Sequence, residues 1–306
     1  MDILRTPDER FEDLPGYPFR PNYLEIPGSD VSNPGLTLRV HYVDEGPIDA
    51  PVVLLLHGEP SWSYLYRKMI PPLVEAGYRT VAPDLVGFGR SDKPAQPTDY
   101  TYQRMVAWTA ATIRALDLEE ITLFCQDWGG LIGLRLIAEN GHLFSRLIAA
   151  NTGLPVGGEM PEAFFQWQRF SQKVSKLPIG RIINGATITP LSREVLAAYE
   201  APFPDETYKA GARVMPALVP TDPDDPEARI NRDLWRRKLA KWPRPVLTAF
   251  SDSDPITGGG EQLFQRLMPG AKGQPHVTVE AAGHFLQEDK GEELAQVVID
   301  FIQAAE

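Results

Sequence analysis

The chain has 306 residues, 43% of them apolar, which is enough for one large domain or for a core with an insertion. Its formal net charge of −11 argues against nucleic acid or an anionic membrane as a partner. No apolar run approaches the roughly 18 residues of a membrane span, and the N-terminus lacks the apolar core of a signal peptide. The lone Cys125 excludes an intrachain disulfide framework and fits a reducing compartment, so we expect a cytoplasmic protein.

Predicted strands alternate with predicted helices in the first half of the chain. Residues 1–35 are rich in Pro and Gly and are expected to lie on the core as an arm. The apolar patterns predict strands at residues 36–43, 51–56, 79–82 and 146–151, and one that starts at Ile121. Helices are predicted at about 63–76 and at 102–116. This alternation is typical of a mostly parallel α/β sheet flanked by helices.

The composition changes after residue 155. Helical segments are predicted near residues 159–175, 192–201 and 205–215, with Pro-rich breaks between them and no clear strand. We interpret residues 156–225 as a helical cap inserted over the sheet, with residues 220–226 as the return linker.

The α/β pattern then resumes, with strands predicted at residues 245–250 and 276–280 and a last helix from about 291 to 303. Residues 1–155 and 226–306 together should therefore form the core.

Asp127 occupies the sharp turn between the strand that starts at Ile121 and a helix that follows Gly129-Gly130. The two glycines let the start of the helix pack close to neighbouring backbone. This order matches the nucleophile elbow, with Asp in place of the usual Ser. A carboxylate at this bend can attack carbon directly and form an ester.

Asp127, Asp254 and His284 each follow a predicted strand, in the nucleophile–acid–base order of α/β-hydrolases. A single Asp after a strand is more often a helix N-cap. The three groups together, in this order, favour a catalytic triad in which Asp254 orients His284. Asp252 competes for the acid role, but Asp-Pro-Ile, which Asp254 begins, commonly marks this position in the fold.

The run His57-Gly58-Glu59-Pro60 has the form of an oxyanion loop. The backbone N–H groups of Glu59 and Trp128 would then point at a developing oxyanion, while the His57 ring is expected to be bonded inside the loop. The five histidines of the chain show no metal-ligand spacing, so no metal is expected. No cofactor is implied either.

Four stretches, at residues 57–71, 84–94, 126–130 and 199–204, closely resemble haloalkane dehalogenases, and the resemblance covers almost the whole chain. It is strongest to the subfamily with an Asp–His–Asp triad and two halide-binding tryptophans. It implies an α/β-hydrolase fold and hydrolysis of small haloalkanes by water to alcohol and halide, through an alkyl ester on an aspartate. One departure is Cys125, where the general elbow pattern has Gly.

The halide site needs N–H donors in a dry pocket, and an indole provides one on a rigid frame. Trp128, beside the nucleophile, is the first candidate. Other dehalogenase subfamilies have a donating Asn at the Glu59 position, and Glu59 cannot donate if it is ionised. The second donor should therefore come from the cap, where Trp167 is the only tryptophan; its alternative role is cap packing. The apolar pocket wall is expected to include Phe164, Phe165, Phe170 and Leu131.

Two alternatives remain open from the sequence. An epoxide hydrolase shares the fold and the Asp–His–Asp groups but needs two donating cap tyrosines, for which Tyr199 and Tyr208 are available. Glu59 and Trp167 favour a halide site instead. A non-catalytic relative that only binds a small ligand is the second alternative, and the intact triad argues against it.

Overall fold

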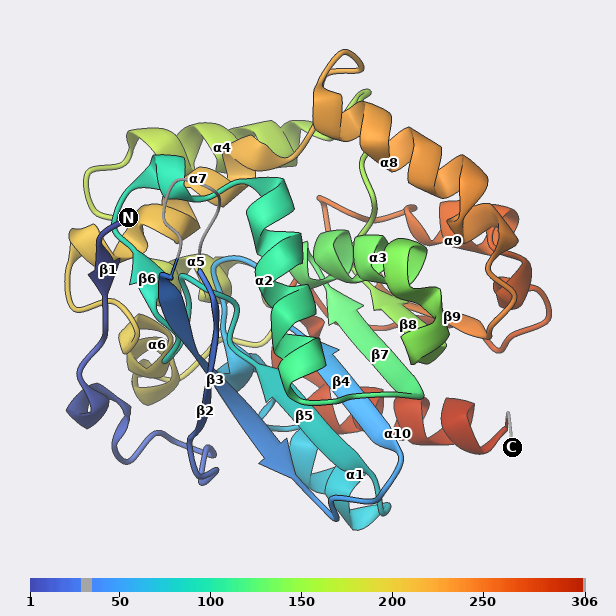
Figure 1. Ribbon diagram of the computed structural model, residues 1–306, viewed down its shortest axis with the longest axis horizontal. Coiled ribbons are helices and arrows are strands. Elements are labelled where there is room, and N and C mark those ends of the chain that lie inside the picture. Colours follow the sequence, from blue (N-terminus) through green and yellow to red (C-terminus); the bar gives the residue numbers. More distant parts are fainter. Residues whose placement is uncertain (29–34, 305–306) are drawn as a thin grey trace.

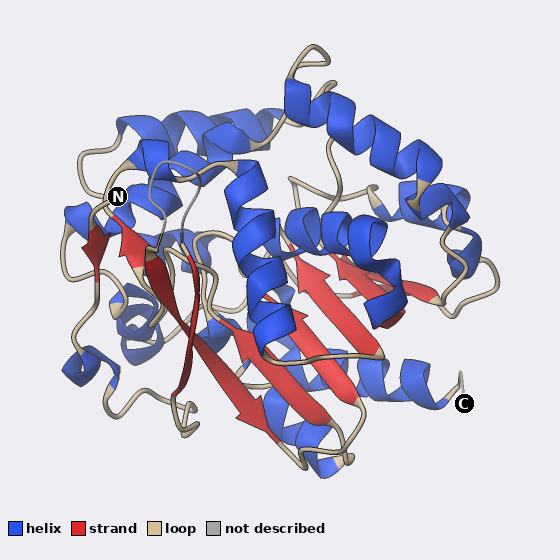
Figure 2. Cartoon of the chain, in the orientation of Figure 1, coloured by secondary structure: helices blue, strands red, loops and turns tan. Residues whose placement is uncertain are grey.

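The computed structural model describes residues 1–28 and 35–304, and an eight-stranded sheet forms its centre (Figures 1 and 2). The strand order is β10-β9-β8-β7-β4-β5-β3-β2. The strands are β2 (Asn22–Pro27), β3 (Thr37–Glu45), β4 (Val52–Leu56), β5 (Arg79–Pro83), β7 (Ile121–Gln126), β8 (Phe144–Ala150), β9 (Val246–Ser251) and β10 (Val277–Val279). Pairing is parallel from β10 to β5 and antiparallel at β3 and β2, which confirms the predicted mostly parallel sheet.

Helices cover both faces of this sheet (Figure 1). Helices α2 (Tyr102–Ala115) and α3 (Trp128–Asn140) lie on one face, and α1 (Ile70–Glu75) and α10 (Leu286–Gln303) lie on the other. The central strands β4, β5 and β7 are buried along their whole length, because helices cover them on both sides. Among the described residues, no helix combines the length and apolarity that crossing a membrane requires.

Four helices follow β8 within residues 156–225: α4 (Glu162–Lys173), α5 (Ile179–Gly185), α6 (Arg193–Glu200) and α7 (Ala210–Leu218). Helix α4 packs against α7, and α5 packs against α6. Figure 1 shows this group on the side toward which β4 and β7 point. The carboxyl ends of the parallel strands therefore face these helices.

Three helices of the structure were not predicted. Helix α5 is short and contains two glycines, which are poor helix formers. Helix α8 (Pro226–Arg237) starts where the predicted return linker ends, and only Ala228, Asn231 and Trp235 are buried on it. Helix α9 (Glu261–Leu267) was likewise not predicted and packs on β9. Their narrow apolar faces and short lengths explain why the hydrophobic period did not reveal them.

Two predicted helix boundaries need correction. The helix predicted over residues 63–76 is a 3-10 turn, Ser63–Tyr66, followed by α1, because the two prolines after Ile70 fit only the first turn of an α-helix. Helix α10 starts at Leu286 and not near residue 291, since non-helical backbone at Lys290 interrupts its pattern.

The N-terminal stretch, predicted as an arm, also contributes strand β2 at the edge of the sheet. Strand β1 (Ile3–Leu4) pairs separately with β6 (Lys93–Pro94). Residues 29–34 of the predicted arm lie outside the described residues.

Leu54 tests the centre of the core. It is fully buried in β4, between Val81 of β5 and Leu123 of β7. Leu54→Ala should lower the free energy of unfolding by about 2–5 kcal/mol, because it removes buried methyl groups and leaves a cavity. Ile48→Ala, at a side chain that is 66% exposed, is the control and should change it by less than about 0.5 kcal/mol. Equal losses in urea denaturation would contradict this placement of the core.

Candidate active site

The turn at Asp127 has a strained backbone. Its φ of 52° and ψ of −127° lie where residues other than glycine rarely occur. A Cβ atom at Gly129 would come within 2.0 Å of the Leu56 carbonyl oxygen, and one at Gly130 within 2.0 Å of the Thr152 hydroxyl. The helix therefore starts in direct contact with neighbouring strands, and only glycines fit there.

Hydrogen bonds hold this strained turn in place. The Asp127 N–H donates to the Asn151 carbonyl at 3.1 Å, and the Asp127 carbonyl accepts from Gly130 N–H at 2.9 Å. The Thr152 hydroxyl donates to the same carbonyl at 2.7 Å. The backbone polar groups of Asp127 are thus satisfied locally, and its carboxylate is left to face the cavity above the sheet.

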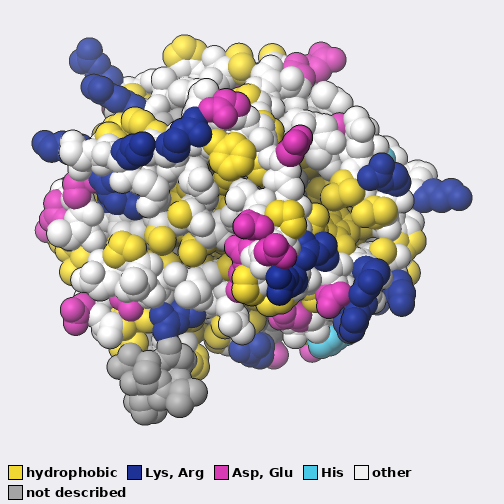
Figure 3. Space-filling view, turned by 90° about the horizontal axis from the view of Figure 1, so that it is seen from above, with side chains coloured by type: hydrophobic (Ala, Val, Ile, Leu, Met, Phe, Trp, Pro, Cys, Tyr) yellow, Lys and Arg dark blue, Asp and Glu magenta, His cyan; other side chains and the backbone are white. Residues whose placement is uncertain are grey.

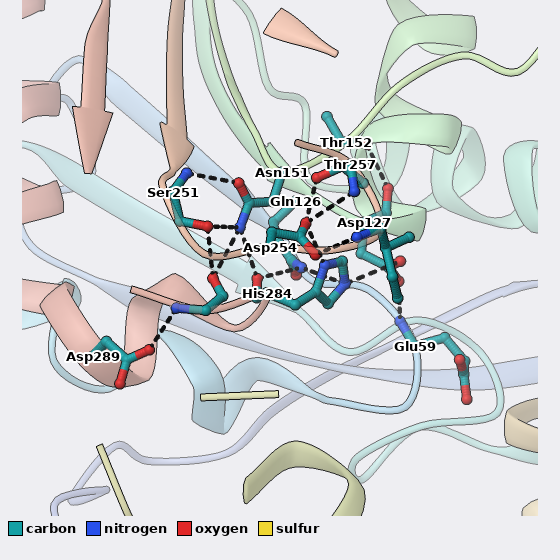
Figure 4. A network of polar contacts seen from close by, with 12 residues as sticks. Glu59, Gln126, Asp127, Asn151, Thr152, Ser251, Asp254, Thr257, His284 and Asp289 are labelled. Atoms are coloured by element: carbon teal, nitrogen blue, oxygen red, sulfur yellow. Dashed lines mark hydrogen bonds and ion pairs between the residues drawn. The ribbon is translucent and has the colours of Figure 1, made fainter. Parts of the chain in front are cut away.

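The carboxylate of Asp127 lies between an N–H donor and a histidine ring (Figure 4). Its Oδ1 accepts from Glu59 N–H at 2.7 Å, and its Oδ2 lies 3.5 Å from His284 Nε2. The other ring nitrogen, Nδ1, lies 2.9 Å from Asp254 Oδ2. The structure therefore brings together the three groups that the sequence singles out, from loops after β7, β9 and β10.

The contacts separate Asp254 from its competitor Asp252. The Asp254 carboxylate also accepts from Ile256 N–H at 2.9 Å and from the Thr257 hydroxyl. Asp252 is exposed and accepts from the Ser253 hydroxyl and from Ala281 N–H, both in loops. Only Asp254 reaches the histidine ring, which agrees with the sequence-based preference.

The charges of this group act on one another. Burial lowers the pKa of His284, but the charge of Asp254 and the hydrogen bond to Asp127 outweigh it and raise this pKa to about 10. Burial acts to raise the pKa of Asp254, but the His284 charge and the hydrogen bonds from His284 and Thr257 lower it to about 2. Any reaction that neutralises Asp127 removes one of the two charges that keep the His284 ring protonated.

Residues around His284 that the sequence did not single out also hold its loop. Gln126 Nε2 donates to the His284 carbonyl at 3.1 Å and lies 3.1 Å from its ring Nε2. Asn151 Nδ2 donates to the carbonyls of Gly283 at 3.0 Å and His284 at 3.1 Å. The only signal for Gln126 and Asn151 in the sequence is their position at the ends of predicted strands.

The loop at His57 approaches the nucleophile closely. A Cβ at Gly58 would lie 2.2 Å from Asp127 Oδ1, so glycine permits the contact between Glu59 N–H and the carboxylate. The His57 ring bonds the Gly58 carbonyl at 2.9 Å and accepts from Leu85 N–H at 2.9 Å, as expected for a structural residue. The N–H of Trp128, the first residue of α3, is among the N–H groups that a helix leaves without an intrahelical partner.

Two cavities meet at Asp127 and Trp128. The first, about 290 Å³, is also lined by Glu59, Trp167 and His284, and by Phe164 and Phe170. The second, about 380 Å³, is lined by Leu131 and Phe164 among other apolar residues. Phe165, expected in the pocket wall, lines neither cavity and packs edge-on against Phe164, with ring centroids 5.6 Å apart. Trp167 therefore shares a cavity with the nucleophile.

Glu59 contributes more than its backbone to this cavity. Its side chain is 4% exposed, and no described group bonds its Oε1. Burial and the charge of Asp127 raise the pKa of Glu59 well above its ordinary value, and a hydrogen bond from Trp167 opposes the rise. The neutral acid is thus favoured, and unlike the ionised form considered from the sequence it has an O–H to donate.

The face of the molecule above the carboxyl ends of the parallel strands carries charges of both signs. Figure 3 shows acidic and basic side chains interspersed with apolar ones on the face seen from above. The described residues also contain no group of three or more His, Cys, Asp or Glu side chains placed to hold a metal ion.

Comparisons with known proteins agree with this geometry. A family model described as alpha/beta hydrolase fold matches residues 51–291. A haloalkane dehalogenase from Psychrobacter cryohalolentis is 58% identical, covering 99% of this chain and 98% of the relative, and one from Mycobacterium marinum is 49% identical, covering 98% and 100%. The solved tetrameric haloalkane dehalogenase DpaA from Paraglaciecola agarilytica is 37% identical, with a TM-score of 0.87 over 97% of each chain.

The pH dependence of stability tests the state of Glu59. Since its pKa in the folded protein lies above the ordinary value of 4.5, the wild type loses stability as pH rises above about 4.5. Glu59→Gln cannot ionise. Its free energy of unfolding relative to the wild type should therefore increase by about 1.4 kcal/mol per pH unit between about pH 4.5 and the raised pKa of Glu59 in the folded protein. Urea denaturation at several pH values measures this difference.

The exposed Glu292 supplies the control for this experiment. Glu292→Gln removes a carboxyl group without changing a buried site and reports the general effect of charge. A difference between Glu59→Gln and the wild type that stays constant between about pH 5 and about pH 8 would show that burial does not suppress ionisation of Glu59.

Proposed function

Because the chain belongs to the haloalkane dehalogenases of the α/β-hydrolase fold, we propose that it hydrolyses small haloalkanes through an alkyl ester on Asp127. The observation that carries the proposal is the position of the Asp127 carboxylate. It lies 3.5 Å from the His284 ring in a cavity whose wall includes two indole rings, Trp128 and Trp167. That arrangement supplies a nucleophile, a base and donors for a leaving anion in one enclosed space.

In the first step, Asp127 attacks the carbon that bears the halogen and displaces halide in line. The carbon–oxygen bond of the ester forms as the carbon–halogen bond breaks. The indole N–H groups of Trp128 and Trp167 stabilise the departing anion, because each donates from an apolar ring. The neutral acid of Glu59, beside Trp167, adds an O–H at the same end of the cavity.

In the second step, His284 takes a proton from a water molecule, which attacks the ester carbonyl. Ester formation removes the negative charge of Asp127 and so lowers the pKa of His284. The ring is then no longer held in its protonated form, and it can accept a proton from water. Asp254 holds the ring and stabilises the imidazolium. The oxyanion falls near Glu59 N–H, which already donates to Asp127, and near Trp128 N–H. Alcohol, halide and a proton are released, with no cofactor.

We assign residues 156–225 to a cap that closes this cavity from above the sheet. The segment supplies Phe164, Trp167 and Phe170 to the cavity wall, together with Ile182 of α5 and Pro216 of α7 among others. The core formed by residues 1–155 and 226–306 supplies the rest of the wall. A cytoplasmic location and the absence of nucleic-acid or membrane partners remain predictions from composition.

The geometry disfavours an epoxide hydrolase. That reaction needs cap tyrosines that donate to the epoxide oxygen, but no tyrosine is among the described residues that line the two cavities. The Tyr199 hydroxyl is buried and bonds Glu288 instead. Halide release from 1,2-dibromoethane and diol formation from styrene oxide distinguish the two activities, and we expect only the first. A protein that binds but does not turn over would show neither.

Replacement of the base should trap the intermediate. His284→Gln leaves Asp127 able to attack but removes the group that activates water, so turnover should fall by about 10²–10⁴-fold. Mass spectrometry of the variant after exposure to 1,2-dibromoethane should find a bromoethyl adduct on the peptide that contains Asp127. Asp127→Asn is the control that cannot be alkylated. A folded His284→Gln variant without the adduct would contradict the mechanism.

Removal of one indole N–H tests the halide site. Trp167→Phe keeps an aromatic ring but removes a donor to a charged group, worth about 1.5–3 kcal/mol, so bromide should bind about tenfold more weakly or worse. Calorimetric titration measures the dissociation constant. Trp235→Phe is the control, since the Trp235 N–H donates to the Leu154 carbonyl at 3.0 Å and Trp235 lines neither cavity. Equal bromide affinity in Trp167→Phe and wild type would exclude Trp167 as a donor.

A further inference from the structure

The loop that carries His284 is in direct contact with the segment after α5. A Cβ at Gly283 would come within 2.4 Å of the Ala186 carbonyl oxygen and 3.1 Å of Thr187 Cα. Phe285 N–H donates to that same carbonyl at 3.2 Å. The residues on either side of His284 therefore touch Ala186 and Thr187, which belong to the helical insertion.

Asp289, in the first turns of α10, joins the two segments with one carboxylate. Its Oδ2 accepts from Gly283 N–H at 2.9 Å, as Figure 4 shows. The same carboxylate accepts from Ile188 N–H at 3.0 Å and from Thr189 N–H at 2.7 Å. Three backbone N–H groups from two distant stretches of chain thus converge on a side chain that is five residues after His284 in the sequence.

The preceding residue, Glu288, makes a second link from α10 to the insertion. It is buried, pairs with Arg67 of the core, and accepts from the Tyr199 hydroxyl of α6. Consecutive carboxylates therefore connect the start of α10 to two places in the α5–α6 unit, which comprises α5, α6 and the segment between them. Asp289 bonds the connecting segment, and Glu288 bonds the C-terminal part of α6. A shift of the α5–α6 unit should therefore also shift the His284 loop.

From the core side, other groups hold the same loop. Asn151 and the Ser251 hydroxyl donate to the Gly283 carbonyl, at 3.0 and 2.8 Å. The peptide groups next to His284 are thus held at their carbonyls by the core and at an N–H by Asp289. Loss of Asp289 leaves the core contacts in place, so we expect the loop to shift and not to unfold.

We infer that Asp289 is a positioning residue for His284, through which the α5–α6 unit sets the placement of the catalytic base. This inference rests on the proposed function, because it assigns Asp289 to one of the two chemical steps. His284 acts only in hydrolysis of the ester. A displacement of about 1 Å at a reacting group can lower a rate by about 10²-fold, and here it affects the second step alone.

The first step should be independent of Asp289. The Asp127 turn is held by Asn151, Thr152 and Gly130, and its carboxylate by Glu59 N–H, none of which contacts Asp289. Trp167 lies on α4, which packs against α7, whereas α5 packs against α6. Asp289 therefore bonds neither the nucleophile nor the halide donors directly.

The test is a rapid-mixing experiment with the full-length Asp289→Asn variant and 1,2-dibromoethane. Asn is the same size but offers a single acceptor oxygen to three N–H groups. The rate and amplitude of the initial bromide release should match the wild type, while the ester, followed by quenching and mass spectrometry, should disappear about tenfold more slowly or worse. Glu292→Gln on the same helix, at an exposed side chain, should change neither phase.

Asp289→Glu separates the contacts from the charge. It keeps the negative charge near the start of α10, where an anion is favourable, and both acceptor oxygens on a longer chain, so it should recover part of the hydrolysis rate. An unchanged hydrolysis rate in Asp289→Asn, or equal slowing of both steps, would overturn the assignment. Absence of any bromide release from the wild type would instead refute the proposed function.

Discussion

The left-handed backbone at Asp127 is the constraint on which the rest of the site depends. It turns the carboxylate out of the sheet, and it persists because surrounding contacts leave no alternative: Gly129 touches the Leu56 carbonyl, and Thr152 bonds the Asp127 carbonyl. The same close packing brings Glu59 N–H to the carboxylate. Strain at one residue is thereby balanced by hydrogen bonds and packing from the segments at the ends of β4 and β8, a common arrangement at catalytic positions.

Different electrostatic environments give the carboxyl groups of the site different roles. The His284 charge and the hydrogen bonds from His284 and Thr257 lower the pKa of Asp254 to about 2, while burial and the charge of Asp127 raise the pKa of Glu59 well above its ordinary value. Asp254 can therefore stabilise the positive charge of the His284 ring, and Glu59 can donate a hydrogen bond. The ionisation of Asp127 connects them, since its negative charge acts on both His284 and Glu59. Formation of an ester on Asp127 therefore changes the pKa of both His284 and Glu59.

Much of this arrangement could be predicted from the sequence, and the missing parts have a physical reason. Buried parallel strands read as apolar runs, and the residues after them, Asp127, Asp254 and His284, meet at one edge of the sheet whatever the intervening chain does. Helix α5 has weak helical propensity, so local pattern did not reveal it. Asp289 gave no signal at all, because its role depends on N–H groups about a hundred residues away in the chain that only the fold brings to it.

The central claim is that the Asp127 carboxylate, and not water, attacks the substrate carbon. It is tested most directly by a single turnover in water labelled with oxygen-18, with enzyme in excess over 1,2-dibromoethane. The account predicts that the alcohol released carries unlabelled oxygen, taken from Asp127, and that the label appears in the peptide that contains Asp127. Labelled alcohol from the first turnover, with no label in that peptide, would contradict it.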